Sequence, residues 1–284
     1  MPLLSVIGFV SQTLFLHPKQ QNRPSLIKLT VIVITKNEAA NIRDCLQSVA
    51  FADQMVVLDS GSTDQTAAIA KEMGAEVYQS TEWPGFGVQK NRALQHATGQ
   101  WVLSIDADER IPPDLARVIS TTVQSGKADA YALARQTQFC GQWIKHCGWT
   151  PDYVVRLFKR DQAQFSLDVV HEKLVLKNPV VNVARLAPAM LHYSYRTSDD
   201  YWNKLQRYSK DWALERYRLG QKTSMSRAAL SGFVAFARSY FFRLGFLDGA
   251  MGFAVCSMQA QSAFGKYFEL YCLHHQNVDT STSL

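Results

Sequence analysis

Residues 29–35 have the sequence LTVIVIT, an apolar and largely β-branched run without alternating polar side chains. Such a run is typical of a strand buried on both faces of a parallel sheet. Lys36-Asn37-Glu38 ends it, and apolar side chains then recur with helical spacing over residues 41–50. A second apolar strand is expected at residues 55–58 and ends at Asp59. This stretch therefore predicts a strand–helix–strand unit of a parallel sheet.

The same alternation continues along the next half-hundred residues. A turn at residues 60–64 leads into a predicted helix, which Asp64 is expected to cap. The further predicted elements, helix and strand in turn, are a helix at 65–73, a strand at 76–78, a helix at 89–96 and a buried strand at 101–105. The fold class that follows is α/β: a Rossmann-like, mostly parallel sheet flanked by helices.

The pattern changes beyond residue 125. Short strands are predicted at 130–135, 154–159 and 174–176, and the signal is helical from Asp199 onward. The organisation that we expect is an N-terminal extension at 1–28, an α/β domain at 29–195, a C-terminal helical region at 196–275 and a polar tail at 276–284.

The N-terminal extension begins with an apolar stretch over residues 2–16. No basic residue precedes this stretch, and it is too short to span a bilayer. An interfacial segment or a start-site artefact is the favoured interpretation over a signal peptide.

The chain carries a net charge of +6 and has a sequence pI of about 9.0. That balance suits an anionic partner, either a phosphorylated substrate, a membrane surface or a nucleic acid. No nucleic-acid-binding module is recognisable, so we expect no nucleic-acid partner.

The five cysteines are scattered, which argues against a disulfide framework and fits a reducing cytoplasm. Cys140, His146 and Cys147 lie close together in the sequence. Because no second ligand pair follows at a zinc-site spacing, free thiols are expected.

Carboxylates follow three of the predicted strands. Glu38 comes after the first strand, Asp59 after the second, and Asp106 and Asp108 after the strand at 101–105. The carboxyl ends of parallel strands line the ligand crevice of such a sheet. Carboxylates clustered in this way repel one another unless a cation compensates, and Mg²⁺ takes one or two of them together with phosphate oxygens. The alternative is that each aspartate only caps the next helix.

Lys90, Asn91 and Arg92 are predicted to open the helix before the strand at 101–105. Cations at a helix N-terminus are suited to bind phosphates. A solvated basic face is an equal alternative.

Two further groups of residues could carry chemistry. His171-Glu172 offers a general base, with Glu172 as the candidate and His171 as its orienting group or second choice. Aromatic and basic side chains that suit a phosphosugar, or only loop packing, gather at Trp143, Lys145, His146, Trp149, Tyr153 and Arg156.

The C-terminal region is basic and aromatic. Residues 199–246 contain nine Lys or Arg and four Asp or Glu, and several phenylalanines alternate with Arg238 and Arg243. Interfacial membrane helices have this composition, and the alternative is a helix packed across the α/β domain. Asp248 and three glycines interrupt the apolar run at 244–258, so a spanning helix is not expected.

The motifs TVIVITKNEAANI, VVLDSGSTDQT, QKNRAL, WVLSIDADE and VHEKL follow one another in this order. Together they resemble glycosyltransferase family 2, the inverting enzymes with the GT-A fold, over roughly residues 29–176. The segments VHEKL, RLFKR and FRLGFLDGAMGF further resemble the lipopolysaccharide inner-core β-1,4-glucosyltransferases.

The resemblance implies a nucleotide-binding half at 29–110 and an acceptor half at 111–195. It implies that Asp59 contacts the base of the nucleotide, with Thr35 and Glu38 nearby. Asp106 would contact ribose or sugar, and Asp108 would bind Mg²⁺ or Mn²⁺ with the diphosphate.

The family often places a Glu-Asp pair at the catalytic carboxylate, where this sequence has His171-Glu172. Inversion implies a single displacement without a covalent enzyme intermediate. The expected reaction moves glucose from UDP-glucose to a heptose of the lipopolysaccharide inner core, in the cytoplasm and peripheral on the inner membrane. The alternatives are another donor sugar, a polyprenyl-phosphate or other cell-envelope glycan acceptor, and a non-catalytic nucleotide-sugar-binding protein.

Overall fold

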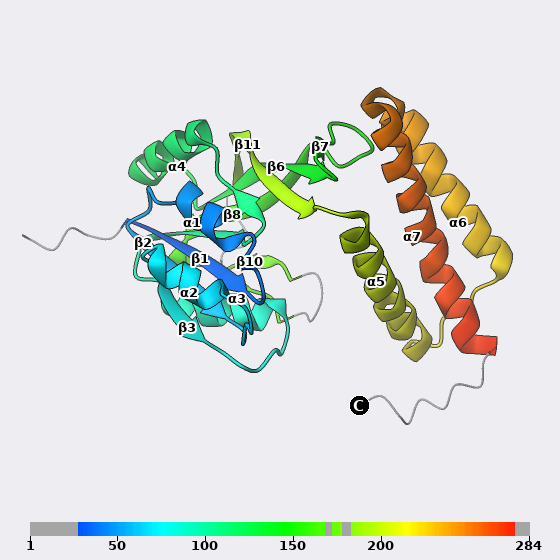
Figure 1. Ribbon diagram of the computed structural model, residues 1–284, viewed down its shortest axis with the longest axis horizontal. Helices are drawn as coiled ribbons and strands as arrows, with labels where there is room; N and C mark the ends of the chain where they lie inside the picture. Colours follow the sequence, from blue (N-terminus) through cyan, green and yellow to red (C-terminus); the bar gives the residue numbers. More distant parts are fainter. Residues whose placement is uncertain (1–27, 168–171, 178–182, 276–284) are drawn as a thin grey trace, which may run out of the picture.

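The computed structural model describes residues 28–167, 172–177 and 183–275. Its centre is a nine-stranded mixed sheet in the order β3-β2-β1-β4-β8-β6-β11-β5, with β7 paired to β6 (Figure 1). A separate two-stranded ribbon is formed by β9 and β10. The strands are β1 (Leu29–Thr35), β2 (Gln54–Asp59), β3 (Glu76–Gln79), β4 (Trp101–Asp106), β5 (Glu109–Arg110), β6 (Ala130–Phe139), β7 (Gln142–Trp143), β8 (Asp152–Lys159), β9 (Ala163–Phe165), β10 (Leu174–Leu176) and β11 (Val183–Tyr195).

The parallel part of the sheet is the part that the apolar runs predicted. All seven residues of β1 are buried, and β1 lies between β2 and β4 with both neighbours parallel to it. The register pairs Thr35 with Asp59 and Ile34 with Asp106. The strand ends that carry candidate site residues therefore lie side by side.

Helices cover both faces of this sheet. Alternate residues of a strand point to opposite faces, and β1 accordingly divides between two cores. Val31 and Val33 pack in one core with residues of α1 (Ile42–Ser48), α2 (Thr66–Glu72) and α4 (Pro113–Ser125). Ile32 and Ile34 pack in the other core with α3 (Phe86–Gln95) and the ribbon of β9 and β10.

The antiparallel part begins at β8, which runs antiparallel to both β4 and β6. Beyond it, β11 is parallel to β6 and antiparallel to β5. No strand was expected over residues 183–195, where polar side chains and Pro188 interrupt the apolar pattern. The register of β11 against β6 shifts between Leu186 and Met190, which lets the strand continue past Pro188.

The start of α3 differs from the predicted one. The helix begins at Phe86 and not at Gln89, since Gly85 stands at its N-cap and the Gln89 N–H already donates to the Gly85 carbonyl. Lys90 therefore lies in the middle of the helix and Arg92 in its last turn, and neither of them opens it.

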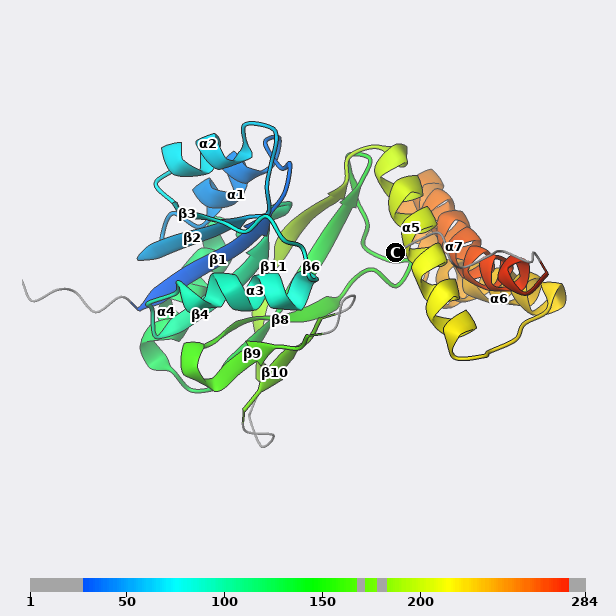
Figure 2. The ribbon, with the colours of Figure 1, turned by 90° about the horizontal axis from the view of Figure 1, so that it is seen from below.

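The predicted C-terminal helical region is confirmed. It consists of α5 (Ser198–Arg218), α6 (Met225–Ala237), a π-helical turn (Arg238–Phe242), a 3-10 turn (Gly245–Asp248) and α7 (Gly249–His275). Figures 1 and 2 show these helices as a bundle beside the sheet. Gly232 approaches the Ala260 carbonyl and Gly265 approaches Ser209, so small residues let α7 pack closely against both neighbours.

Among the described residues, no single helix has the length and hydropathy of a membrane span. The segments Met225–Phe242 and Gly245–His275 reach the required length and hydropathy only when they are taken together, and the chain is bent by 72° at the break between them.

Asp248 joins the helical bundle to the sheet. Its buried carboxylate accepts hydrogen bonds from the backbone N–H groups of Lys145 and His146, at 3.2 and 2.8 Å, and pairs with His146 Nδ1 at 2.8 Å. The loop after β7 is thereby held against the turn before α7.

Candidate active site

A cleft of about 700 Å³ opens where β1 and β4 end. Four of the predicted site residues line it: Thr35, Glu38, Asp106 and Asp108. The walls from other parts of the chain include His192, Lys204 and Arg207. The structure thus places the predicted carboxylates of β1 and β4 around one cavity.

Asp106 is held by two cations. Its Oδ2 accepts from Arg156 at 2.6 Å, and Lys90 Nζ lies 3.2 Å from Oδ1. Burial acts to raise the pKa of Asp106, but Arg156 and then Lys90 outweigh it, so the pKa lies far below its ordinary value. Asp106 is therefore ionised and oriented before any ligand arrives.

Glu109 fixes the turn that carries both aspartates. It is fully buried, and its Oε2 accepts from the Asp106 N–H at 3.0 Å while Oε1 accepts from Arg156 at 2.6 Å. Arg135 lies 3.5 Å from the same Oε1. One guanidinium, that of Arg156, thus bridges two carboxylates at the end of β4.

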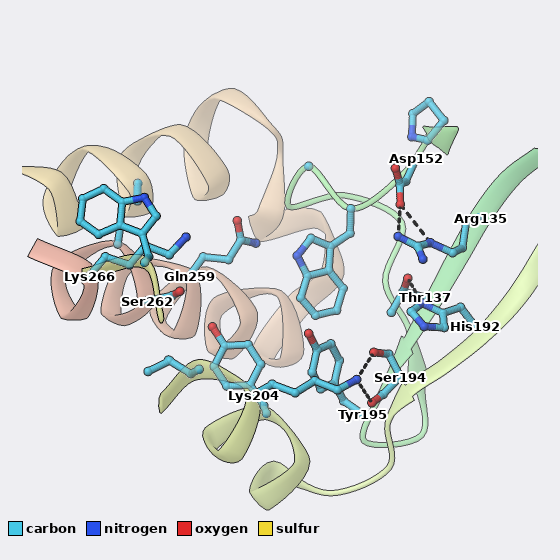
Figure 3. A pocket seen from close by; sticks show the side chains of 18 of the residues that line it. Arg135, Thr137, Asp152, His192, Ser194, Tyr195, Lys204, Gln259, Ser262 and Lys266 are labelled. Atoms are coloured by element: carbon cyan, nitrogen blue, oxygen red, sulfur yellow. Dashed lines mark hydrogen bonds and ion pairs between the residues drawn. The ribbon is translucent and has the colours of Figure 1, made fainter. Parts of the chain in front are cut away.

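Asp108 has a different partner. His192 Nε2 lies 3.3 Å from Asp108 Oδ2, and a 3.2 Å hydrogen bond joins His192 Nδ1 to Thr137 Oγ1 (Figure 3). Burial acts to raise the pKa of Asp108, but the hydrogen bond and the charge of His192, together with Lys204, outweigh it and lower the pKa. A carboxylate and an imidazole that is oriented from behind therefore face the cleft together.

Glu38 and Thr35 form the wall at the end of β1. Burial raises the pKa of Glu38, although a 2.6 Å hydrogen bond from Asn41 opposes the shift. Thr35 Oγ1 is buried and has no hydrogen-bond partner among the residues that the structure describes. An unpartnered hydroxyl in the wall of a cleft is suited to contact a polar ligand.

Asp59 lies outside the lining of this cleft. Its buried carboxylate accepts from the backbone N–H of Ser62 at 3.0 Å and from the Ser62 hydroxyl, which closes the turn after β2. The same turn is tied to the loop after β1, because the Asn37 N–H donates to Ser62 Oγ. The nucleobase contact of Asp59 stays a prediction.

Asp64, which was expected to cap α2, lies one residue before the N-cap, Gln65. Its Oδ1 accepts from the Thr66 N–H at 3.0 Å at the start of α2. Its Oδ2 also accepts from the Ala39 N–H at 3.1 Å, so the residue holds the loop after β1 as well.

Neither Lys90 nor Arg92 lies at the N-terminus of α3, because Lys90 is in mid-helix and Arg92 is in the last turn. The Lys90 ammonium is buried between Asp106 and Glu172, at 3.2 and 2.7 Å. Arg92 donates to Ser80 Oγ at 2.6 Å and lies 3.4 Å from Glu82. The predicted position of Lys90 and Arg92 at a helix start was wrong, and their role in donor binding stays a prediction.

Glu172 reaches the site through Lys90. Its side chain is mostly buried, and its Oε1 lies 2.7 Å from the Lys90 ammonium that also contacts Asp106. The other predicted member of this pair, His171, lies outside the described residues.

The cluster of aromatic and basic residues after β7 separates in the structure. Trp143 packs edge-on against Tyr193, and the ring of Tyr153 lies under the guanidinium of Arg185. Trp149 lines a cavity next to the cleft.

Several residues of the cleft were not anticipated. His192 lies on β11, a strand that the sequence pattern did not predict, and Lys204 and Arg207 lie on α5. No local motif marks them, because each reaches the cleft only through the tertiary fold. For Arg156 a signal was available, since it begins the RLFKR segment.

No group of three or more His, Cys, Asp or Glu side chains is placed to hold a metal ion among residues 28–167, 172–177 and 183–275. Asp108 and His192 are two such groups in contact. The expectation of free thiols agrees with the structure, in which all five cysteines are unpaired.

Comparison with known proteins gives one matching family model, described as glycosyl transferase family 2, over residues 30–176. An uncharacterized glycosyltransferase of Rickettsia prowazekii is 30% identical over 266 residues, which are 89% of this chain and 91% of the relative. A protein of Rhizobium meliloti named lipopolysaccharide core biosynthesis glycosyltransferase LpsC is 28% identical over 272 residues, which are 90% of this chain and 98% of the relative.

Two solved structures are similar at lower identity. S. aureus TarS (residues 1–349) aligns with a TM-score of 0.43 and 15% identity, over 87% of this chain and 90% of that one. Glucosyl-3-phosphoglycerate synthase of Mycobacterium tuberculosis aligns with a TM-score of 0.37 and 22% identity, over 48% and 57%.

The first prediction concerns Arg156. Arg156→Met leaves Asp106 and Glu109 facing each other without their shared cation, so the free energy of unfolding should fall by about 3–5 kcal/mol. Chemical denaturation at neutral pH measures this. As a control, Arg43→Met removes a bidentate pair with Glu72 on the exposed face of α1 and should leave the unfolding midpoint nearly unchanged. Equal midpoints for the two variants would contradict the role of Arg156.

Proposed function

The chain belongs to glycosyltransferase family 2, and on that premise we propose that it moves glucose from UDP-glucose to a heptose of the lipopolysaccharide inner core with inversion. The LpsC relative, which is named for lipopolysaccharide core biosynthesis and aligns over nearly its whole length, supports the acceptor class. The observation that carries the proposal is the cleft at the ends of β1 and β4, in which Asp106 and Asp108 have different partners.

The donor side of the cleft suits a nucleoside diphosphate sugar with a divalent ion. Asp108 and His192 provide two donors at one place, and Mg²⁺ or Mn²⁺ takes its remaining ligands from phosphate oxygens and water. The bound ion would neutralise the departing diphosphate. Asp106, already fixed by Arg156, would accept hydrogen bonds from ribose or sugar hydroxyls, and Thr35 and Glu38 would contact the nucleotide nearby.

Asp108→Asn tests the metal and donor assignment. UDP release is measured from UDP-glucose, UDP-galactose and UDP-N-acetylglucosamine, with and without Mn²⁺, in the presence of truncated lipopolysaccharide. The unsubstituted enzyme should prefer UDP-glucose with Mn²⁺, and Asp108→Asn should lower kcat/KM by about a hundredfold or more, because a charged ligand of the ion is lost.

Asp161→Asn is the matched control, because Asp161 is exposed and pairs only with the adjacent Arg160 among the ion pairs of the described chain. It should keep the activity and the metal requirement. Full, metal-dependent activity of Asp108→Asn would refute its role as a ligand.

On the acceptor side we propose Glu172 as the base, with His171 as orienting group or second choice. A single displacement at the anomeric carbon requires the acceptor hydroxyl to lose its proton as the new bond forms. The mostly buried Glu172 carboxylate would accept that proton, and the Lys90 ammonium at 2.7 Å would hold it in position beside Asp106.

Glu172→Gln keeps the size of the side chain and removes the base. The value of kcat should fall by about a hundredfold or more, while the KM for the donor changes little. The control is Glu82→Gln, a substitution at a glutamate whose side chain is 83% exposed. Losses in kcat and in donor affinity of equal size would assign Glu172 a binding or structural role.

We also propose that the enzyme is cytoplasmic and peripheral on the inner membrane. Apolar side chains are exposed around the bend before α7, among them Leu230, Phe233, Val234, Phe241, Phe242, Phe246, Leu247 and Phe253. Arg238 and Arg243 are exposed in the same segment. An apolar surface bordered by cations is suited to the interface of an anionic bilayer.

The double substitution Phe241→Ser and Phe242→Ser tests this surface by co-sedimentation with vesicles that contain phosphatidylglycerol. Each phenylalanine buried in lipid contributes about 1.5–3 kcal/mol, so binding should weaken by about tenfold or more. Leu167→Ser is the control, because Leu167 is 73% exposed on the other part of the molecule. The proposed contact would be excluded if vesicle binding of the unsubstituted enzyme depended neither on anionic lipid nor on the salt concentration.

A further inference from the structure

A second cavity, of about 710 Å³, lies between the sheet and the helical bundle. Arg135 and Thr137 of β6 line one side, and Gln259 and Lys266 of α7 line the other (Figure 3). The size is in the range of cavities that bind a small ligand.

This cavity and the donor cleft share a wall. His192, Ser194, Tyr195 and Lys204 line both of them. Because His192 contacts Asp108 on the donor side, a ligand that fills the second cavity reaches the place where the donor diphosphate would be held.

The charges of the second cavity favour an anion. Arg135, Lys204 and Lys266 line it with one carboxylate, Asp152. That carboxylate is already neutralised by Arg135, whose Nε and a terminal nitrogen donate to Asp152 Oδ2 at 3.0 and 2.5 Å.

The two lysines remain available to a ligand. Lys204 Nζ donates to the carbonyl and the hydroxyl of Ser194, at 3.2 and 3.0 Å, and an ammonium has a third hydrogen to donate. Lys266 is half-buried, and in the part of the chain that the structure describes no carboxylate lies within ion-pair distance of it. A half-buried cation without a counter-ion in a cavity wall is suited to bind an anionic ligand.

The rest of the lining suits a sugar ring. Trp149, Tyr195, Trp212 and Tyr267 expose aromatic surface to the cavity, and Gln259 and Ser262 add neutral polar groups. Aromatic rings contact the apolar faces of sugars, while the polar groups orient their hydroxyls.

We infer that the second cavity is the acceptor site and that it binds a sugar bearing a phosphate, with Lys266 holding the phosphate on the helical side. This inference rests on the proposed glycosyl transfer for its biological meaning, but the binding itself does not require a donor. The sugar would extend from α7 to the wall that the two cavities share.

The test is calorimetric titration of the full chain, without donor, with a deacylated inner-core oligosaccharide that carries phosphate and with the same oligosaccharide after phosphatase treatment. Removal of the phosphate should weaken binding to the unsubstituted protein by about tenfold, the value of one charge-assisted contact. Lys266→Gln should weaken binding of the phosphorylated oligosaccharide by about the same factor and leave the dephosphorylated one unchanged.

Two further variants separate charge from folding. Lys266→Arg keeps the cation and should restore most of the affinity, whereas Lys210→Gln, at an exposed position of α5, should have no effect. If the phosphate has no effect on binding, or if Lys266→Gln weakens both oligosaccharides equally, the inference is overturned.

The outcome is independent of the donor assignment. Phosphate-dependent binding without transfer from any UDP-sugar would contradict the proposed function and leave the acceptor site standing. Glycosyl transfer that is unaffected by Lys266→Gln would contradict the acceptor site and leave the proposed function standing.

Discussion

One buried guanidinium orders the end of β4. Arg156 of β8 lies between Asp106 and Glu109, at 2.6 Å from each. The segment 106–109 at the end of β4 contains three carboxylates within four residues. Without a cation these carboxylates would repel one another in a partly dehydrated cleft. Strand β8, which runs antiparallel to β4, supplies the cation. Because Leu103 of β4 pairs with Leu157 of β8, the neighbouring Arg156 lies toward the carboxyl end of β4.

The same arrangement gives Asp106 and Asp108 different neighbouring groups. Asp106 has two permanent cations as partners, so its carboxylate is an oriented hydrogen-bond acceptor. Asp108 has an imidazole instead, and a neutral imidazole is itself a metal ligand, which neither a guanidinium nor an ammonium is. The metal and donor proposal follows from this difference more than from the presence of two aspartates.

The sequence predicted the part of the fold whose elements are locally self-consistent. The buried run of β1 and the strand ends at Asp59 and Asp106 follow from β-branched segments that end in polar residues, and the registers of β1 confirm their alignment. The start of α3 was predicted at Gln89 and lies at Phe86. The N-cap is Gly85, which has no side chain that could signal a cap in the sequence. Strand β11 was not predicted, because Pro188 and the polar residues of the strand interrupt its apolar pattern. His192, which lies on β11, was therefore not predicted as a site residue.

Contacts between distant segments explain why the surroundings of Glu172 and of the second cavity were less predictable than the ends of the parallel strands. Lys90 and Glu172 are separated by 82 positions in the chain, and Gln142 by 106 from the Asp248 carbonyl that it contacts. No local pattern reports such pairs. Trp149 shows the same limit, since only its place between the sheet and α7 distinguishes it from the packed Trp143.

The division of the molecule into a sheet and a helical bundle has a mechanical consequence. If the acceptor lies between the two, their relative position decides whether its hydroxyl meets the donor. Asp248 secures that position, because its buried carboxylate ties the Lys145–His146 backbone to the turn before α7. Since the exposed phenylalanines surround the same turn, a contact of this turn with the membrane would place the acceptor cavity beside the surface from which a lipid-anchored glycan projects. The carboxylate that interrupts the apolar run at 244–258 thus holds the turn before α7 against the loop after β7.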